Sequence, residues 1–287
     1  MTGIVDWQKI RELTSGDRRP ESPEKADETW SKFAPMYDFM SSLERRYTLA
    51  QVDEMILDKT DSVLDIGCGI GRLTVPVAKR VAKVTALDVA GGMLEYCTQN
   101  VRAAGLTNVR AKKLDWKNAV IGKDIETHDV AFASRSVGLN DILKLNQVAN
   151  KYAFLLSFAR YPSLRHVSLE LLQGLKEDAP DPAESAAEDW RSLGYNVTFN
   201  ILYDLGLDPM VHVIEDGFER TYPNREDAYQ DLAFLTREVV PEGALEPEQW
   251  EIFKKNVDLY LTPTNGGDYQ FKRTTQTYVM GWETRDL

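Results

Sequence analysis

The sequence of 287 residues contains few of the side chains that most often bind metals, with only two cysteines and three histidines. Cys68 and Cys97 do not form a Cys-x-x-Cys pair, which argues against a zinc site or a disulfide framework. We therefore predict that the protein holds no metal. Sparse cysteine is typical of proteins in a reducing compartment, and we expect a cytoplasmic location.

Basic residues are outnumbered, and long apolar runs are missing. The 45 acidic residues exceed the 34 lysines and arginines, which gives a net charge of −11. Non-specific binding to nucleic acid depends on neutralising phosphates with lysine and arginine, so we expect no strong affinity of this kind. A membrane-spanning helix needs about 18 or more apolar residues in a row, and the sequence has no such run. The segment Met1–Arg19 also lacks the apolar core of a signal peptide.

The region from residue 62 to 158 alternates between short apolar runs and helical patterns, which is typical of a parallel sheet covered on both faces by helices. The five expected strands are Ser62–Ile66, Val84–Asp88, Val109–Leu114, His128–Ser134 and Tyr152–Phe158. We therefore predict an α/β fold with a doubly wound, mostly parallel sheet and right-handed crossovers.

The second half of the chain is less regular. Strand-like alternation returns in Val211–Thr221 and Phe271–Trp282, and these are the expected last two strands. Helical patterns at Asn224–Val239 and Glu248–Leu261 predict a helical insertion between them, at about residues 224–262.

The N-terminal part of the chain is expected to be helical and to precede the sheet. A short amphipathic helix is expected around residues 7–13, and Arg18–Pro23 has the composition of a linker. An aromatic segment at residues 30–39 and a separate helix near Tyr47–Leu57 follow. We therefore predict an N-terminal helical extension or lid at residues 1–58 and an α/β domain at residues 59–287.

A glycine turn follows the first expected strand, and the second expected strand ends in an acid. The turn Gly67-Cys68-Gly69-Ile70-Gly71 lets a ligand approach the backbone closely, and the next helix offers free N–H groups to an anion. Asp88 is placed to accept ribose hydroxyls. A dinucleotide fingerprint would need its third glycine at position 72, which is Arg72, and the lysine of a P-loop is also missing. The alternative is a turn that merely packs a helix on a strand.

The order Asp65-x-Gly67-x-Gly69-x-Gly71 resembles motif I of the class I S-adenosylmethionine-dependent methyltransferases. The resemblance covers residues 62–158 well and the remainder loosely. It implies a Rossmann-like fold with a seven-stranded sheet, whose last two strands form an antiparallel hairpin. It also implies S-adenosylmethionine as cofactor and S-adenosylhomocysteine as product.

The same resemblance assigns a role to each residue of the donor site. The turn, including Cys68, would line the methionine part, and Asp65 would orient its ammonium group, although Asp65 could also simply cap the turn. The remaining assignments are Asp88 to the ribose, Val89 and Met93 to the faces of the adenine, Asp115 to the adenine amino group, Trp116 to the ring edge and Ser134 to the methionine part.

The segment Trp30–Asp38 resembles the lid of menaquinone and ubiquinone methyltransferases. By this resemblance Tyr37 would close over the donor, and its ring face would favour the sulfonium by cation–π attraction. We therefore name Tyr37 as a candidate for both cofactor binding and catalysis. The alternative is a short helix that packs its aromatic residues on the core, which we prefer for Trp30 and Phe33.

The sequence indicates the residues that bind the methyl acceptor less clearly. Arg135, Arg160 and Arg165 follow the fourth and fifth strands and are candidates to bind a carboxylate or phosphate of the substrate, or else they are surface arginines. His166 is a candidate general base, with a polar residue at a helix start as the alternative. The Asn/Asp-Pro-Pro-Tyr motif of amino methyltransferases that act on nucleobases or glutamine is missing after the fourth strand, where Ser134 and Arg135 stand instead.

These observations predict a methyltransferase that transfers a methyl group from S-adenosylmethionine to a small organic acceptor by in-line displacement. One alternative is an RNA or protein methyltransferase. Another is a non-enzymatic regulatory protein that binds S-adenosylmethionine. The sequence identifies neither the acceptor nor the oligomeric state.

Overall fold

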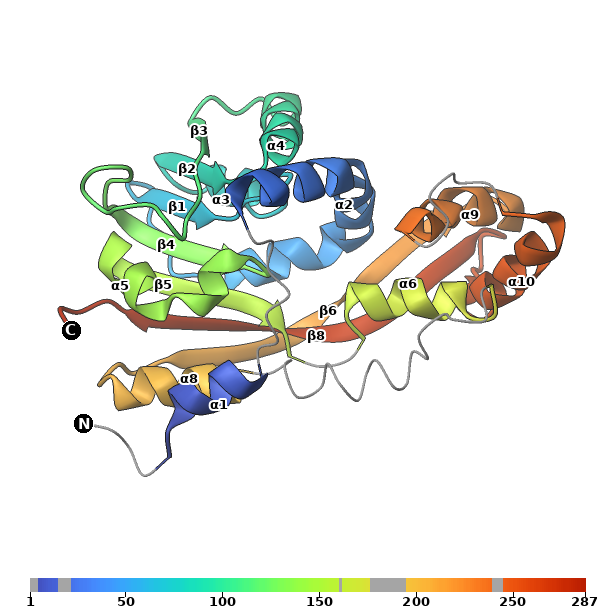
Figure 1. Cartoon of the computed structure of the whole chain (residues 1–287). Coiled ribbons are helices and arrows are strands. Elements are labelled where there is room, and N and C mark those ends of the chain that lie inside the picture. The colour runs from blue at the N-terminus through green and yellow to red at the C-terminus, as the bar shows by residue number, and fades with distance from the viewer. Residues whose placement is uncertain (1–4, 15–21, 160–161, 176–194, 239–244) are drawn as a thin grey trace. The chain divides into compact units, whose positions relative to one another are not determined.

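The computed structural model describes the whole chain except residues 1–4, 15–21, 160–161, 176–194 and 239–244 (Figure 1). The chain forms two compact units. The first comprises residues 1–159, 194–214 and 277–287, and the second comprises residues 160–193 and 215–276. No helix among the described residues is long and apolar enough to cross a membrane.

The sheet has the predicted doubly wound arrangement. Strands β1 (Ser62–Ile66), β2 (Lys83–Asp88), β3 (Val109–Lys113), β4 (His128–Ser134) and β5 (Ala149–Phe158) are parallel and lie in the order β3-β2-β1-β4-β5. The order reverses between β1 and β4, and ligands of open α/β sheets bind beside the carboxyl ends of the strands at such a point.

Two long strands complete the sheet. Strand β8 (Tyr269–Glu283) runs antiparallel to β5, and β6 (Met210–Tyr222) lies outside β8. The expected mostly parallel sheet with two final strands is thus confirmed. A short further strand, β7 (Leu261–Pro263), pairs with β8 and brings the sheet to eight strands where seven were predicted.

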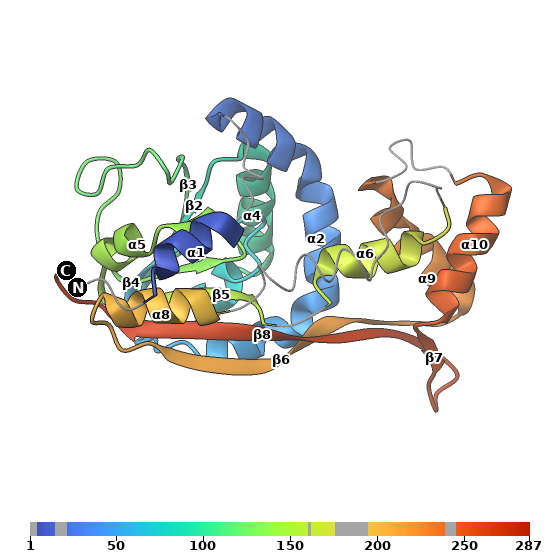
Figure 2. The same ribbon diagram turned by 60° about the horizontal axis from the view of Figure 1, so that its bottom comes forward.

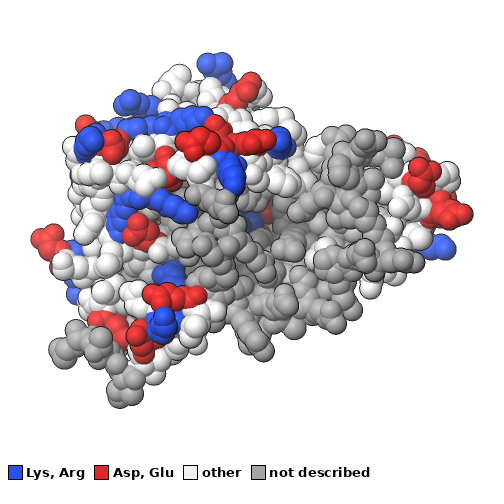
Figure 3. All heavy atoms as spheres, viewed as in Figure 1, with Lys and Arg blue, Asp and Glu red and all other residues white. Residues whose placement is uncertain are grey.

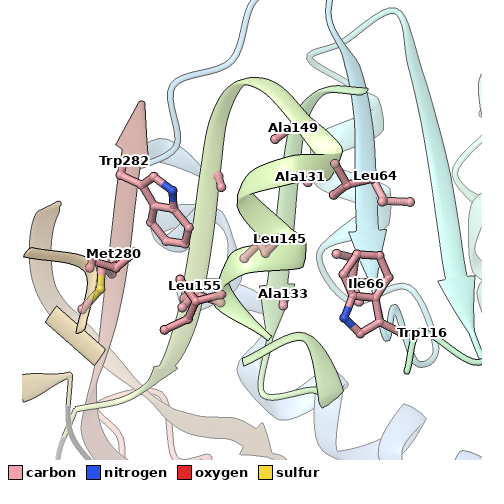
Figure 4. Packing of buried hydrophobic residues seen from close by; sticks show 14 of the residues in the cluster. Leu64, Ile66, Trp116, Ala131, Ala133, Leu145, Ala149, Leu155, Met280 and Trp282 are labelled. Atoms are coloured by element: carbon pink, nitrogen blue, oxygen red, sulfur yellow. The ribbon is translucent and has the colours of Figure 1, made fainter. Parts of the chain in front are cut away.

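Successive residues of the strands point to opposite faces, and both faces are buried. One face of the sheet carries Leu64, Ala131, Leu155 and Met280, against which Leu145 packs. Figure 4 shows these side chains gathered between the sheet and α5 (Ile142–Val148). The other face carries Val63, Phe132, Phe154 and Val279 and packs against Val52 and Val77. Burial on both sides explains why the strands form near-continuous apolar runs.

The helices of the first unit include α1 (Trp7–Thr14), α3 (Thr74–Ala78), α4 (Gly91–Ala103) and α8 (Asn196–Asp204), with a 3₁₀ turn η1 (Val137–Asn140) after β4. The prediction of two separate segments before β1 is wrong. A single helix of 31 residues, α2 (Pro23–Asp53), occupies this region and contains Pro35. Figure 2 shows that α2 bends in its middle part, as expected where proline removes a helical hydrogen bond.

The second unit contains α6 (Leu164–Leu172), α9 (Arg225–Leu232), the 3₁₀ helix η2 (Ala233–Glu238) and α10 (Pro247–Asp258), together with β7 and parts of β6 and β8. The predicted helical insertion between the last two strands is confirmed. The Asn224 side chain caps α9 by accepting a hydrogen bond from the Asp227 N–H at 2.9 Å. Asn256 of α10 donates to the Leu171 carbonyl at 3.0 Å and so ties α10 to α6.

One prediction falls largely outside the described residues. It is the linker at Arg18–Pro23, of which only the last two residues are described.

Candidate functional site

The glycine turn adopts a backbone conformation that side chains rarely allow. Gly67, Gly69 and Gly71 have φ values of 69°, 54° and 87°. A Cβ at Gly67 would lie 2.5 Å from the Cβ of Ser136, and a Cβ at Gly71 would lie 2.9 Å from the Cys97 Sγ. At Gly69 the nearest atom to such a Cβ is the Met93 Sδ at 4.0 Å. The turn is therefore packed on both sides and open at its central glycine.

Hydrogen bonds fasten this turn to the end of β2. The N–H groups of Gly67 and Cys68 donate to the Leu87 carbonyl at 2.8 and 2.9 Å. The Gly69 N–H donates to Asp88 Oδ2 and the Ala90 N–H donates to Asp88 Oδ1, both at 2.9 Å. Burial raises the pKa of Asp88, and these backbone hydrogen bonds oppose that rise. The structure thus brings the glycine turn and the predicted ribose-binding acid into direct contact.

Asp65 lies beneath the turn and is almost completely buried. Thr74 donates its hydroxyl to Asp65 Oδ2 at 2.5 Å. Burial raises the pKa of Asp65 to about 7, and the Thr74 hydrogen bond opposes this rise. The Cys68 thiol is also buried, and its pKa is raised by a hydrogen bond with Cys97 and by burial. The buried side chains of Asp65 and Cys68 therefore help to fix the conformation of the turn.

Met93 packs in a small buried cluster with Ala34, Ile70 and Ala90, and Val89 packs against this cluster. Ala34 belongs to α2, so this helix covers part of the region where the adenine faces were predicted.

Two polar residues of α2 cap the start of α4. Neither was predicted as a site residue. The Gly91 N–H donates to Asp27 Oδ1 at 2.7 Å, and the Gly92 N–H donates to the Ser31 Oγ at 2.9 Å. Asp27 also forms an ion pair with Lys113. The one signal in the sequence is that Ala90, at the N-cap position of α4, has no side chain able to cap it.

Asp115 and Trp116 follow β3 as predicted. The half-buried Asp115 accepts hydrogen bonds from the Lys117 N–H at 3.1 Å and from Asn118 Nδ2 at 2.6 Å, so it stabilises its own turn. The Trp116 ring is fully buried beside Ile66 (Figure 4), with Lys144 Nζ 4.5 Å from its centroid. Among the described residues, the indole N–H of Trp116 has no hydrogen-bond acceptor. The side chain of Trp116 thus lies in the core, and its backbone follows the end of β3.

Ser134 ends β4 and Arg135 follows it, and both side chains contact charged partners. Arg135 adopts a φ of 49° and donates to both oxygens of Glu44 at 2.8 and 3.0 Å. Its guanidinium also lies 3.6 Å from the centroid of Phe158. The Ser134 Oγ accepts a hydrogen bond from Arg72 Nη2 at 2.9 Å. Glu44 and Arg72 were not predicted as site residues, although Arg72 marked the departure from the dinucleotide motif.

The two candidate catalytic residues lie in different units. Tyr37 is partly exposed on α2 of the first unit and meets Trp30 edge-on, with the ring centroids 5.8 Å apart. His166 belongs to the second unit and is fully buried. Its Nδ1 lies 2.6 Å from the Ser163 Oγ in a capping box at the start of α6. This geometry agrees with the alternative prediction for His166, a polar residue at a helix start.

Arg160 and Arg165 are the remaining predicted substrate residues. Arg160 lies outside the described residues, and Arg165 is described only as part of α6. Within the described ranges, no three His, Cys, Asp or Glu side chains gather where they could hold a metal ion.

A family comparison matches the same part of the chain that carries this site. Residues 63–157 fit a family model described as a methyltransferase domain. The crystal structure of the YcgJ protein from Bacillus subtilis superposes with a TM-score of 0.50 at 13% identity, covering 84% of this chain and all of that protein. This likeness shows a common fold.

Relatives with curated sequences match over shorter stretches. An uncharacterized protein of Haemophilus influenzae is 29% identical over 65% of this chain and 66% of its own length. A 23S rRNA (uracil(1939)-C(5))-methyltransferase of Psychromonas ingrahamii is 31% identical over 26% of this chain and 17% of its own. A probable cobalt-precorrin-6B C(15)-methyltransferase of Methanocaldococcus jannaschii is 37% identical over 26% of this chain and 47% of its own. The matches thus span less than two thirds of each of these relatives. The family match thus assigns a methyltransferase domain to residues 63–157, and the glycine turn lies within this domain.

Proposed function

We propose that this protein transfers the methyl group of S-adenosylmethionine to a small organic acceptor by in-line displacement. The observation that carries this proposal is the open backbone at Gly69, whose N–H is bonded to Asp88 Oδ2 at 2.9 Å. That contact joins the turn predicted for the methionine part of the donor to the acid predicted for its ribose.

The reaction depends mainly on how the donor and the acceptor are positioned. A sulfonium is already a good leaving group, and well-oriented reactions gain about 7–11 kcal/mol from the alignment of the reacting atoms. In this proposal the glycine turn and Ser134 hold the methionine part, and Asp65 faces its ammonium. Asp88 accepts the ribose hydroxyls. Val89 and Met93 flank the adenine, Asp115 accepts a hydrogen bond from its amino group, and Trp116 borders the ring with its backbone.

The charge of the chain favours a small acceptor over RNA. The relatives include both an rRNA methyltransferase and a precorrin methyltransferase, so they leave the acceptor class open. The net charge of −11 opposes the phosphate contacts that drive RNA binding. On the face shown in Figure 3, the coloured lysines and arginines lie among acidic residues.

Donor binding is the direct test. We expect Asp88→Ala to weaken binding of S-adenosylhomocysteine about tenfold to a hundredfold in calorimetry, because charge-assisted hydrogen bonds contribute about 1.5–3 kcal/mol. The matched control is Asp129→Asn. Asp129 bonds the Ser62 N–H at 2.8 Å, at the other end of the strands. Unchanged affinity in a folded Asp88→Ala protein would contradict the proposal.

The acceptor class is tested with an isotopically labelled methyl donor. We expect label to pass into small molecules of a cell extract and not into its RNA or protein. Salt-dependent RNA binding together with labelled RNA would favour the RNA methyltransferase instead. Donor binding without any labelled product would favour a regulatory protein.

Proton removal from the acceptor is a separate step, for which Tyr37 and His166 stay the predicted candidates. A general base would give a rate that rises with pH, and its removal would flatten that profile. The pH–rate profiles of Tyr37→Phe and His166→Gln test each residue. His166→Gln keeps an amide oxygen that is able to accept the Ser163 N–H hydrogen bond, now accepted by His166 Nδ1 at 3.2 Å.

A further inference from the structure

One edge of the sheet in the first unit is basic, although the chain as a whole is acidic. Residues 109–124 contain five lysines and arginines and only two acids, in a chain with a net charge of −11. The two acids stabilise their own turns: Asp115 accepts from the Lys117 N–H at 3.1 Å, and Asp124 accepts from the Val120 N–H at 2.9 Å. The five cations, which we call the β3 basic edge, are Arg110, Lys112, Lys113, Lys117 and Lys123.

Three of these five cations have no acidic partner in the part of the chain that the structure describes. Lys113 forms an ion pair with Asp27, and the half-buried Lys112 donates to a backbone carbonyl. Arg110, Lys117 and Lys123 are exposed, and they form no ion pair with any described residue. Their charges are therefore available to a partner.

Strand β3 also has a backbone edge that is open to pairing. It is the last strand at one end of the sheet, and among the described strands it pairs only with β2 (Figure 1). At its two ends, the Asn108 carbonyl and the Leu114 N–H each hydrogen-bond to β2 at 2.9 Å. Because the bonding groups of a parallel strand alternate in direction, Val109, Ala111 and Lys113 direct their N–H and C=O groups outward. Such groups form a template for a further strand.

The two faces of this edge differ in character. Arg110 and Lys112 share one face, since alternate residues of a strand point the same way. Lys123 lies beside this face, because Lys112 donates to the carbonyl of the residue that follows Lys123. On the other face Val109 is half-buried and packs with Leu106 on the apolar cluster beneath α4. A strand added at this edge would thus meet cations on one face and apolar side chains on the other.

We propose that the β3 edge binds an extended acidic segment of a partner protein as an additional strand. Backbone hydrogen bonds would supply the pairing, and carboxylates opposite the cations would supply the specificity. The same cations oppose pairing of β3 with the β3 strand of a second copy, because like charges would face each other. The cations would also attract RNA, but its phosphates only accept hydrogen bonds and would leave the outward C=O groups of β3 unpaired.

The test compares three labelled synthetic peptides on the wild-type protein by fluorescence anisotropy. The first alternates glutamate and valine, so that its carboxylates share one face. The second has lysine in place of glutamate, and the third keeps the acidic sequence with methylated backbone nitrogens. We expect the first to bind at least about tenfold more tightly than either of the others and to lose affinity as salt is added. Bound acidic peptide should slow hydrogen exchange at the amides of Val109, Ala111 and Lys113.

A charge-reversal variant tests the cations directly. In the double variant Arg110→Glu and Lys123→Glu, repulsion replaces attraction, and we expect the acidic peptide to bind at least about tenfold more weakly. The matched control is Lys59→Glu with Lys79→Glu. It makes the same change in net charge at two exposed lysines elsewhere in the first unit, and it should bind the peptide as the wild-type protein does.

Three results would overturn the inference. The first is equal binding of the acidic peptide and its backbone-methylated form, since charge alone would then suffice. The second is tighter binding of a single-stranded RNA oligonucleotide than of the acidic peptide at the same ionic strength. The third is self-association of the protein that is lost in the Arg110/Lys123 double variant, which would make a second copy the partner. The first two comparisons use the wild-type protein and hold even if the double variant does not fold.

Discussion

At the scale of single residues, the buried carboxyl group of Asp65 has a pKa far above its ordinary value. Its pKa lies at about 7 because it is buried, whereas an aspartate in an unfolded chain has a pKa near 3.9. Between these values the folded state binds more protons than the unfolded state. The contribution of Asp65 to the free energy of unfolding therefore falls as the pH rises from about 4 to about 7, and it levels off above that.

The variant Asp65→Asn should remove this pH dependence. We expect the variant to gain stability relative to the wild-type protein as the pH rises from 5 to 8, by at most about 3 kcal/mol, since about two pH units of this range lie below the pKa of Asp65 and one pKa unit corresponds to about 1.4 kcal/mol. Urea unfolding at several pH values measures the effect. The control is Asp129→Asn, because the Ser62 hydrogen bonds lower the pKa of Asp129 and its contribution is lost only in more acidic solution. An Asp65→Asn protein that keeps the wild-type slope between pH 5 and 7 would show that Asp65 is not the group responsible.

At the scale of elements, the strands were predictable and the longest helix was not. β1 and β4 match their predicted bounds. A short apolar run flanked by polar residues leaves little choice of where the strand begins and ends. The aromatic segment at residues 30–39 and the helix near Tyr47–Leu57 were predicted as separate elements. In α2 one helix runs from the first into the second, and it is buried against its neighbours on either side of Pro35, with Ala34 buried before the proline and Met40 and Leu43 buried after it. Packing thus overrides a local signal in this element.

Contacts between elements also explain why some site residues were not predicted. Asp27 and Ser31 cap a helix that begins about sixty residues later in the chain, and sequence spacing does not reveal such a contact. Glu44 has a role only because Arg72 and Arg135, far apart in sequence, meet it. The residues of the glycine turn were predictable because their conformational requirement is local.

The contact between α2 and α4 gives a prediction about the start of α4. In the double variant Asp27→Ala and Ser31→Ala, the Gly91 and Gly92 N–H groups lose their acceptors. We expect a loss of about 1–2 kcal/mol in stability, as for other lost helix caps, and faster release of the donor. Hydrogen exchange should show weaker protection at the first turn of α4.

The control for this variant is Glu28→Ala. Glu28 lies on the same helix and pairs with Lys32 at an exposed position, so its removal should change neither exchange nor donor release. Unchanged donor release in the Asp27/Ser31 double variant would separate the capping of α4 from donor retention.

At the scale of the whole molecule, the chain combines one predictable unit with one that the sequence described only in outline. The family match at residues 63–157 and the proposed donor residues all fall in the first unit. The second unit holds the helices of the insertion together with α6 and parts of β6 and β8. The alternating pattern of a strand does not reveal the residue at which the strand passes from one unit to another, so this boundary was not predictable.

The division of the chain into two units predicts which helices and strands a bound donor stabilises. A ligand that binds only the folded form of one unit stabilises that unit by mass action. We expect saturating S-adenosylhomocysteine to slow hydrogen exchange in β1, at the start of α4 and in α2. Exchange in α9 and α10 of the second unit should change little. Equal protection of α9 and α10 would show that the second unit takes part in donor binding, and it would contradict the assignment of the donor site to residues of the first unit alone.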